Sequence, residues 1–359
     1  YAGDAKKPFK VVHPLLLQGK NTADTDELHA GDIGALSKVD DLYYGCVLHS
    51  DPADAGIVLP RPPYPRPMFG LAIEPARRGD ESRMGEVLQK MLAEDPTLAV
   101  DHDVQLNETV LRGLTEMHVR TVLERMKDQF KLEVTTSAPS VPYRETIGAA
   151  AEGHARHKKQ TGGAGQFGEV FLKVEPLPRG AGFEFVDRVK GGVIPFNLIP
   201  AVEKGVREVL ATGYMAGYPI TDIRVTVYDG KSHPVDSKEV AFVAAGRKAM
   251  LDALAKAQPQ ILEPIVEIAV SAPESTMGAI TGDIAARRGQ VQGTDNLAPG
   301  VMEIKALVPL SELTGYAARL HALTQGAGAF TMDLADYHTV PAQKAQELAS
   351  HYQRKDEED

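Results

Sequence analysis

Residues 157–170, His157-Lys-Lys-Gln-Thr-Gly-Gly-Ala-Gly-Gln-Phe-Gly-Glu-Val170, carry the strongest fold signal in this chain, because basic and amide residues run directly into four glycines. Gly163, Gly165 and Gly168 satisfy the dinucleotide-binding spacing G-x-G-x-x-G. That motif binds phosphate when a helix follows the glycines. Residues 169–175 are instead rich in β-branched and aromatic side chains, which predicts a strand. We therefore expect a glycine-rich loop that leads into a strand, and no dinucleotide-binding fold.

The composition is typical of a large globular protein with several domains. The chain has 359 residues, of which 43% are hydrophobic and 25% are charged, and no apolar run approaches the roughly 20 residues that span a bilayer. The single cysteine, Cys46, excludes an internal disulfide framework and a cysteine-based zinc site, and it favours the cytoplasm. The formal net charge of −10 argues against a generally nucleic-acid-binding surface, so any such contact is expected to be local.

Proline marks the first boundary in the chain. Residues 60–67, Pro-Arg-Pro-Pro-Tyr-Pro-Arg-Pro, predict a stiff linker, because proline fixes φ and lacks a backbone donor. Residues 1–59 contain strand-like runs at 9–17 and 41–48, and they predict part of a β-barrel that is too small to close alone. At the other end of the chain, residues 341–359 predict a helix and an acidic tail.

Two segments, residues 68–138 and 261–340, each predict the order βαββαβ of a ferredoxin-like domain. Asp80 is the expected N-cap of the first helix in one segment, and Gly289 is the expected C-cap in the other. The second helix of the later segment is expected over residues 311–325. The expected strands are 69–74, 98–102, 108–112 and 132–135 in the first segment and 265–270, 290–293, 301–308 and 329–334 in the second. A short echo at the first helix supports a repeat: Glu81-Ser-Arg-Met-Gly85 and Glu274-Ser-Thr-Met-Gly278.

Residues 139–260 form a third unit, which contains the glycine-rich stretch. Pro200 suits the first turn of a helix that ends at Gly213, and Asp229-Gly230 predicts a turn. Asp236 and Glu239 resemble a capping box that opens a helix toward residue 258. The expected strands are 169–177, 182–189 and 220–228.

Common catalytic and metal-binding motifs do not occur in the sequence. There is no G-x-x-x-x-G-K-[ST], H-E-x-x-H, C-x-x-C or G-x-S-x-G. His154 and His157 have a spacing that could share a metal, but we interpret them as exposed loop histidines in a basic strip. Asp101, His102 and Asp103 are interpreted as surface charge at a strand end, because adjacent strand residues point to opposite faces.

Two polar loops of the third unit are the best candidate for a binding site. One is the glycine-rich loop, and the other is residues 229–236 with His233. If both project from one end of a sheet, they form a narrow tip of backbone amides, the side-chain amides of Gln160 and Gln166, and a few cations. Such a tip suits folded RNA, which proteins recognise through phosphates, 2′-hydroxyls and shape. Two ordinary hairpins with glycines in their turns explain the same residues equally well.

The chain resembles bacterial translation elongation factor G, in order and without large gaps from about Ala30 to Pro341, and the motifs that carry the resemblance lie in the fourth and fifth domains. The motifs in the fourth domain are Pro142-Tyr-Arg-Glu-Thr-Ile147, Lys158-Lys-Gln-Thr-Gly-Gly163, Gly165-Gln-Phe-Gly168, Gly191-Gly-Val-Ile-Pro195, Ala216-Gly-Tyr-Pro219 and His233-Pro-Val-Asp-Ser237. The motifs in the fifth are Met277-Gly, Gly282-Asp, Arg287-Arg-Gly289 and Thr324-Gln-Gly326.

This resemblance implies an α+β multidomain fold: the end of a second-domain β-barrel, then two ferredoxin-like domains that flank a fourth domain like domain 2 of ribosomal protein S5. It implies that the GTPase domain, with its GTP and magnesium, is missing upstream, so that the chain alone is no enzyme and holds no cofactor or metal. The expected partner is the ribosome. The fourth-domain tip would enter the decoding centre and promote movement of tRNA and mRNA, and the fifth domain would approach the large-subunit GTPase-associated region. The expected protein is a cytoplasmic monomer without membrane contacts.

The resemblance also assigns candidate ribosome or RNA contacts. At the tip these are Lys158, Lys159, Gln160, Gly162, Gly163, Gln166 and His233, and in the fifth domain they are Arg287 and Arg288. A place at a helix C-terminus, where cations are favoured, explains the two arginines equally well.

The sequence departs from the family at three places. Ala164 and Ala327 stand where the family usually has arginine, and Thr115-Glu-Met-His118 replaces Gly-Glu-Leu-His. The loss of two cations weakens the expected attraction to phosphate and favours a divergent paralogue. Ribosome protection or recycling is therefore the alternative to translocation. A dinucleotide enzyme and a stand-alone interaction module are the alternatives from other classes.

Overall fold

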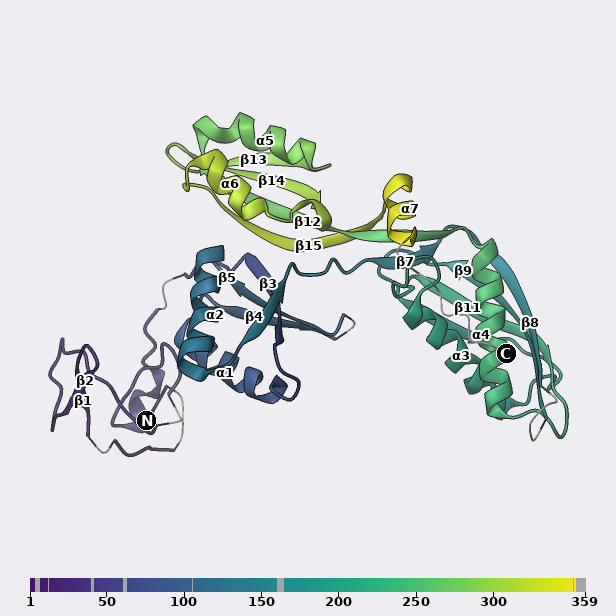
Figure 1. Ribbon diagram of the computed structural model, residues 1–359, viewed down its shortest axis with the longest axis horizontal. Helices are drawn as coiled ribbons and strands as arrows, with labels where there is room; N and C mark the ends of the chain where they lie inside the picture. The colour runs from purple at the N-terminus through teal and green to yellow at the C-terminus, as the bar shows by residue number, and fades with distance from the viewer. Residues whose placement is uncertain are drawn as a thin grey trace. The chain divides into compact units, whose positions relative to one another are not determined.

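The computed structural model describes residues 1–3, 7–11, 13–39, 42–60, 63–104, 106–159, 165–350 and 352 (Figure 1). The chain divides into two compact units, Tyr1–Pro139 and Ser140–Asp359. Three of the expected contacts, Gln160, Gly162 and Gly163, lie outside the described residues, as does Ala164.

The start of the first unit contains little regular structure among its described residues. Strands β1 (Leu15–Gln18) and β2 (Asn21–Asp24) form an antiparallel hairpin, and η1 (Pro52–Gly56) is a short 3-10 helix. The expected strand at 9–17 is therefore limited to its last residues, and the described part of 41–48 has only an isolated bridge at Leu48. Leu16 and Leu17 remain exposed because no second layer packs on this hairpin. No closed barrel forms within the described residues of this segment, as expected.

The rest of the first unit is a ferredoxin-like domain. Its elements are β3 (Phe69–Pro75), α1 (Glu81–Glu94), β4 (Ala99–Asp103), β5 (Glu108–Gly113), α2 (Glu116–Phe130) and β6 (Val134–Ser137). The antiparallel sheet has the order β4-β5-β3-β6, which confirms the predicted βαββαβ pattern. Asp80 is the N-cap residue of α1, but its side chain makes no capping bond. The apolar helix faces form the core, with Met84, Val87, Leu88, Met91, Val119, Val122 and Met126 buried.

His118 joins the two helices of this domain. Its Nε2 lies 2.9 Å from Oδ2 of Asp95, the residue that follows α1, and its Nδ1 accepts a hydrogen bond from the Leu114 backbone. Thr115 caps α2 through its hydroxyl, which accepts from the His118 N–H. In Thr115-Glu-Met-His118, which replaces Gly-Glu-Leu-His, the histidine therefore has a structural role. The threonine at the first position adds a side-chain cap to α2.

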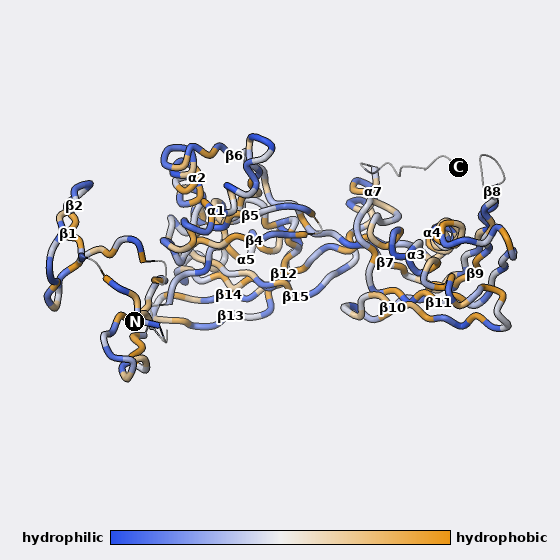
Figure 2. The backbone as a smooth tube through the Cα atoms, turned by 90° about the horizontal axis from the view of Figure 1, so that it is seen from below, coloured by the Kyte–Doolittle hydropathy of each residue, from blue (hydrophilic) through white to orange (hydrophobic). Residues whose placement is uncertain are grey.

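The middle domain begins the second unit. Its elements are β7 (Arg144–Ile147), β8 (Ala151–Lys159), β9 (Gln166–Pro176), β10 (Phe183–Asp187), η2 (Phe196–Leu198), α3 (Ile199–Thr212), β11 (Ile223–Lys231) and α4 (Glu239–Lys256). The sheet has the order β10-β11-β9-β8, with β10 parallel to β11 and the other pairs antiparallel. Helices α3 and α4 cover one face, and hydrophobic stretches of β9, β11 and α4 form the core (Figures 1 and 2).

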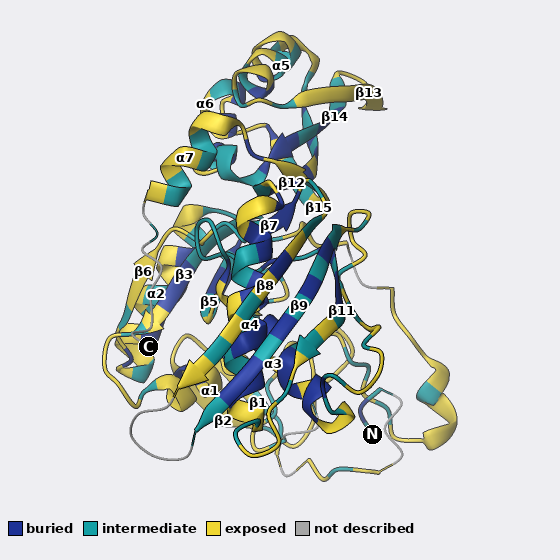
Figure 3. Cartoon of the chain, turned by 90° about the vertical axis from the view of Figure 1, so that its right-hand side faces the viewer, coloured by how far each residue is buried: buried dark blue, intermediate teal, exposed yellow. Residues whose placement is uncertain are grey.

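Three expectations for this domain were wrong. Residues 151–159 form strand β8, with exposed and covered positions alternating along it (Figure 3), so His154 and His157 are not loop residues. They also lie on opposite faces of the sheet, because an odd spacing in a strand reverses direction. Strand β11 continues through Asp229 and Gly230 with a bulge instead of a turn, and Gly230 has no side chain that would collide with Ile194. Helix α4 begins after Lys238, so Asp236 is not its cap.

Two of the sequence motifs quoted above meet at a buried carboxylate in this domain. Glu145 is only 1% exposed, and its two carboxylate oxygens accept four backbone N–H bonds of 2.7–3.2 Å. The donors belong to Tyr214, Met215, Ala216 and Tyr218. Hydrogen bonds to a charged acceptor are strong. These motifs therefore hold β7 to the segment that follows α3.

The C-terminal domain repeats the ferredoxin-like pattern. Its elements are β12 (Pro259–Pro273), η3 (Glu274–Thr276), α5 (Met277–Ala286), β13 (Gln290–Ala298), β14 (Val301–Pro309), η4 (Leu310–Glu312), α6 (Tyr316–Thr324) and β15 (Ala329–Thr339), followed by α7 (Ala342–Ser350). The order β13-β14-β12-β15 matches that of the first domain, strand for strand. The expected helix at 311–325 is divided, because Gly315 takes a left-handed conformation (φ 71°) before α6. Strand β12 also pairs with β7 of the middle domain.

Candidate RNA interface at the tip of the middle domain

The strand directions of the middle domain bring four segments to one end of its sheet. Strand β8 ends at Lys159 and β9 begins at Gln166, while β11 runs antiparallel to β9 and ends at Lys231. Strand β10 is parallel to β11 and ends at the same side. We call this end the tip and define it as the described residues among 156–169, 187–199 and 229–240. The ends of β8 and β9, which flank the glycine-rich loop in the sequence, therefore lie at the same end of the sheet as the second loop.

The second loop packs directly against the start of β9. The Phe167 backbone N–H donates to the Asp236 carbonyl (2.9 Å), and the Ser237 hydroxyl donates to the Phe167 carbonyl (2.8 Å). The Ser237 hydroxyl also accepts from the His233 N–H at 2.7 Å. A Cβ added at Gly165 would lie 2.6 Å from Asp236 Oδ1, so glycine is needed for this approach. The geometry thus makes the second loop and the start of β9 one surface.

His233 is half exposed on this surface. Its Nδ1 accepts weak hydrogen bonds from the backbone N–H groups of Val235 (3.4 Å) and Asp236 (3.3 Å). Asp236 Oδ2 also lies 3.3 Å from Nδ1, so protonation at that nitrogen would form an ion pair. Within the described residues, Nε2 makes no hydrogen bond. The neutral ring therefore holds its own loop through Nδ1 and keeps Nε2–H for a ligand.

Phe167 and Gln166 are held by side chains of β8. Phe167 is buried beneath the Arg156 guanidinium, which lies 5.2 Å from the ring centroid, and it meets the His233 ring edge-on. The Oε1 atom of Gln166 lies 2.9 Å from Nε2 of His157 and accepts its proton. The amide oxygen of Gln166 is therefore occupied, and its NH₂ group is the part available to a ligand.

The tip carries a group of unpaired cations. Five exposed lysines make no ion pair with any residue that the structure describes: Lys158, Lys159, Lys190, Lys231 and Lys238. Residues 160–164 contain no acidic residue that would neutralise them. Two nearby acids serve the backbone instead, because Asp187 accepts from the Val189 N–H and Asp229 from the Gly230 N–H. The tip is therefore locally basic in a chain of net charge −10.

Sequence reasoning named only two of these five lysines. Lys190 precedes the Gly191-Gly192 pair, Lys231 lies within the second loop, and Lys238 follows that loop. A lysine beside a turn residue was the available signal, but the fold was needed to show that all three belong to the same end of the sheet.

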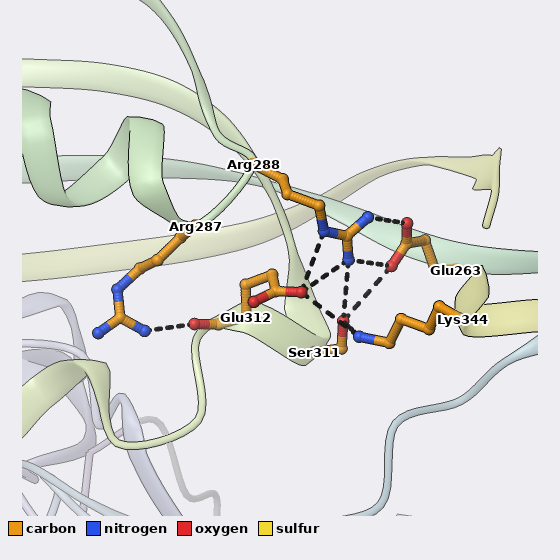
Figure 4. A network of polar contacts seen from close by, with 6 residues as sticks. All are labelled: Glu263, Arg287, Arg288, Ser311, Glu312 and Lys344. Carbon is orange, nitrogen blue, oxygen red and sulfur yellow. Dashed lines mark hydrogen bonds and ion pairs between the residues drawn. The ribbon is translucent and has the colours of Figure 1, made fainter. Parts of the chain in front are cut away.

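Arg287 and Arg288 occupy a different environment, at the end of α5 in the C-terminal domain (Figure 4). The two guanidinium nitrogens of Arg288 bind both oxygens of Glu263, at 2.6 and 2.8 Å, and a third contact of 2.8 Å reaches Glu312. Glu263 is only 2% exposed. Hydrogen bonds to Glu263 raise the pKa of Arg288 further above its usual range. This arginine is committed to an ion-pair network around the buried Glu263 carboxylate, which also includes Ser311 and Lys344.

The backbone at this helix end differs from the expectation that Gly289 caps α5. Arg288 takes the left-handed conformation (φ 59°), and its N–H donates to Ala285 while the Gly289 N–H donates to Ile284. This is the Schellman pattern, in which glycine usually holds the left-handed position. Gly289 is required for another reason: an added Cβ would lie 2.6 Å from the Ile284 side chain. The contacts of the Arg288 side chain with Glu263 and Glu312 offset the cost of this left-handed backbone.

Arg287 also has internal partners. Its Nε donates to Asp283 at 2.8 Å, its Nη1 donates to the Glu312 carbonyl, and its guanidinium lies 5.2 Å from the centre of the Tyr316 ring. Burial raises the pKa of Tyr316 to about 12. Both arginines therefore have internal partners that explain their position at the end of α5. Their contact with RNA stays a prediction.

Other kinds of site find no support in the described part of the chain. There, no group of three or more His, Cys, Asp or Glu residues has the geometry to hold a metal ion. None of the helices in that part combines the length and the apolar content that crossing a membrane requires.

Comparisons with known proteins give the family. Three family models match in order: elongation factor G domain III over residues 64–138, domain IV over residues 139–258, and the elongation factor G C-terminus over residues 260–348. A crystal structure of a protein from Thermus thermophilus is 37% identical, with a TM-score of 0.77. The match covers 94% of this chain and 50% of that one, so the chain spans about half the length of that protein. The chain therefore belongs to the elongation factor G family of translation factors and contains its domains III and IV and its C-terminal domain.

Proposed function

We propose that this chain is the ribosome-binding portion of an elongation-factor-G-like translational GTPase and promotes movement of tRNA and mRNA through the tip of domain IV. The observation that carries the proposal is the tip itself, where the second loop packs against the start of β9 and five exposed lysines lack ion pairs among the described residues. Family membership supplies the ribosome as the class of partner.

The physical argument rests on local charge and shape. A protein with a net charge of −10 is repelled by RNA at a distance, so its contacts must be concentrated where cations are free. The tip is formed by strand ends and loops, which suits entry into folded RNA better than reading of a duplex groove. Lys158, Lys159, Gln166 and His233 contribute described side chains to this surface, and we assign Gln160, Gly162 and Gly163 to it from the sequence.

The proposal extends to the whole protein. The tip enters the decoding centre, and the C-terminal domain approaches the GTPase-associated region of the large-subunit RNA. Arg287 and Arg288 remain candidate contacts there, but any phosphate must compete with Asp283, Glu263 and Glu312 for them. GTP and magnesium bind to a separate GTPase domain, and the protein acts as a cytoplasmic monomer.

The test is ribosome binding and single-round translocation by the full-length protein with Lys158→Gln/Lys159→Gln and, separately, His233→Ala. We expect weaker binding and slower translocation, because the variants remove charge and a donor from the tip. Lys127→Gln is the matched control, since Lys127 is an exposed lysine of domain III paired with Glu133. Unchanged affinity and rate in both tip variants would refute the proposal.

Ribosome protection or recycling is the second candidate, and Ala327 favours it. This residue is exposed in the loop after α6, where family members usually carry arginine, so the cation expected to bind a phosphate there is missing. Assays of subunit splitting and of drug release from ribosomes, run beside translocation on the same full-length protein, separate the two functions.

A further inference from the structure

We propose that Phe196, at the tip of domain IV, is a stacking platform for an unpaired RNA base. The inference rests on the proposed function and adds to it the chemical class of the contact. Phe196 is 87% exposed, more than any other aromatic residue that the structure describes. An aromatic ring left in water forgoes the stabilisation that burial gives, and contact with a ligand would recover it.

The neighbours of Phe196 hold the ring outward. Ile194 and Leu198 on either side are buried, and Ile194 packs so closely on β11 that a Cβ at Gly230 would lie 2.5 Å from its Cδ1. The Leu198 N–H donates to the Pro195 carbonyl at 2.8 Å, and the Ile199 N–H donates to the carbonyl of Phe196. The backbone of Phe196 is therefore fixed by its neighbours while its side chain is free. A ring presented in this way loses little conformational entropy when a ligand binds.

The surroundings of the ring favour nucleic acid over protein. Ile194, two residues before Phe196, lies against Gly230, the residue before Lys231, and Lys190 lies in the same loop as Phe196. Neither lysine has an ion pair among the described residues. Single-stranded nucleic acids bind where aromatic rings accept bases and neighbouring cations accept phosphates. An apolar protein partner would also suit Phe196, but it would leave these lysines unpaired. The combination of ring and free cations therefore selects an RNA strand with an unstacked base.

The first experiment measures binding of the 359-residue chain to a short unstructured RNA and to an RNA duplex by fluorescence anisotropy. We expect preference for the single strand, and a loss of about fivefold or more in its affinity with Phe196→Ala, from the usual strength of base stacking. Phe196→Tyr keeps a ring and should bind like the natural chain. Val235→Ala is the matched control, since Val235 is an exposed apolar residue of the same tip without a ring.

Folding of each variant is checked by its urea unfolding midpoint, which should not change because the Phe196 side chain is exposed. Equal binding of the Phe196→Ala variant to the single strand, or a loss that is the same for the duplex, would overturn the stacking proposal. The Lys190→Gln variant should lower the salt dependence of binding while leaving the preference for single strands intact.

A second experiment separates this proposal from the proposed function. Ribosome affinity of the full-length protein is measured with Phe196→Ala and with Lys158→Gln/Lys159→Gln. If both variants weaken binding, both proposals stand; if only the lysine variant does, stacking fails while ribosome binding through the tip stands. Weaker ribosome binding by Phe196→Ala with unchanged RNA affinity would assign the ring to a ribosomal protein and overturn stacking. If neither variant has an effect, both proposals fail.

Discussion

Basic residues lie beside glycines at two places in this chain, and the fold treats them in opposite ways. At the domain IV tip, Lys158 and Lys159 precede the glycine-rich loop and find no carboxylate among the described residues. At the end of α5, Arg287 and Arg288 precede Gly289 and bind Asp283, Glu263 and Glu312. In the sequence, both are cations beside a turn. In the structure, one group is available to a ligand and the other is part of the fold.

A basic motif in a sequence can bind a ligand only if the fold leaves its cations without internal partners. A lysine ammonium on a strand end keeps its hydration and is free to exchange water for phosphate. The Arg288 guanidinium has replaced water by the two oxygens of a buried carboxylate, a geometry that arginine supports and lysine does not. Removing such a partner leaves a buried charge alone, whereas removing a free lysine leaves nothing unpaired. The two regions should therefore respond differently to the same kind of substitution.

The largest effect is expected for Arg288→Met, which tests whether the arginines at the end of α5 stabilise the C-terminal domain. Loss of the guanidinium leaves Glu263 buried without its partner, which costs about 3–5 kcal/mol. Hydrogen exchange of the β12 amides, followed by mass spectrometry, should show faster opening of the C-terminal domain. Arg319→Met is the matched control, because Arg319 also pairs with a carboxylate but is half exposed. A similar small effect in both variants would remove the distinction between the two regions.

A large effect on binding, with no effect on folding, is expected for Lys231→Gln/Lys238→Gln. These lysines were not among the sequence-based candidates, so they test the tip as the structure defines it. RNA affinity should fall several-fold, and the slope of log affinity against log salt should decrease by about 0.7 for each phosphate that the variant no longer binds. Stability should stay within about 0.5 kcal/mol, as for other surface changes. An unchanged salt slope would show that these two lysines do not bind phosphate.

Acid pH should weaken the C-terminal network while the lysines of the tip keep their charge. Burial raises the pKa of Asp283, but hydrogen bonds from Arg287 and Arg319 outweigh it and leave the pKa below its usual range. Burial also raises the pKa of Glu312, and Arg288 and Lys344 likewise bring it below that range. A lowered pKa in the folded state means that stability is present above the ordinary carboxyl pKa of about 4 and is lost as the pH falls through the folded value.

The measurement is hydrogen exchange in the C-terminal domain between neutral and acid pH, corrected for intrinsic rates. Protection should decrease below about pH 4, and Arg288→Met should flatten part of this dependence, because Glu312 then keeps only Lys344 as an ion-pair partner. Acid does not remove lysine charge, so the tip keeps its cations. A protection profile independent of pH in the natural chain would contradict the assignment.

The smallest effect is expected for Ala327→Arg, which adds an exposed cation to the loop after α6 in the C-terminal domain. Ala327 is exposed, so the larger side chain meets no obstacle in its own surroundings and stability should not change measurably. Ribosome affinity of the full-length protein should rise slightly at low salt and not at high salt. A rise of the same size at both salt concentrations would show that the gain is not electrostatic.

Much of the fold could be predicted from local sequence pattern. The two βαββαβ domains were predicted because their apolar positions follow helix and strand periods, and both sheets have the same strand order. Strand β8 was missed because the polar residues of its open face, such as His154 and Lys158, alternate with alanine and glycine and not with large apolar residues. The caps at Asp236 and Gly289 were wrong because a capping motif describes only local options, and here Phe167 and Arg288 determine the backbone geometry.

The sequence by itself determined the family, the order of the domains and the presence of two polar loops, because these depend on residue types at short spacing. The tertiary structure alone decided which cations are free. Lys190, Lys231 and Lys238 are distant from Lys158 along the chain and meet it only because four strands end at one side of a sheet. Arg288 is separated from Glu263 by a helix, and their pairing depends on the packing of that helix on the sheet that contains β12. Charge is a property of residues, but its availability is set by which other charges the fold brings within reach.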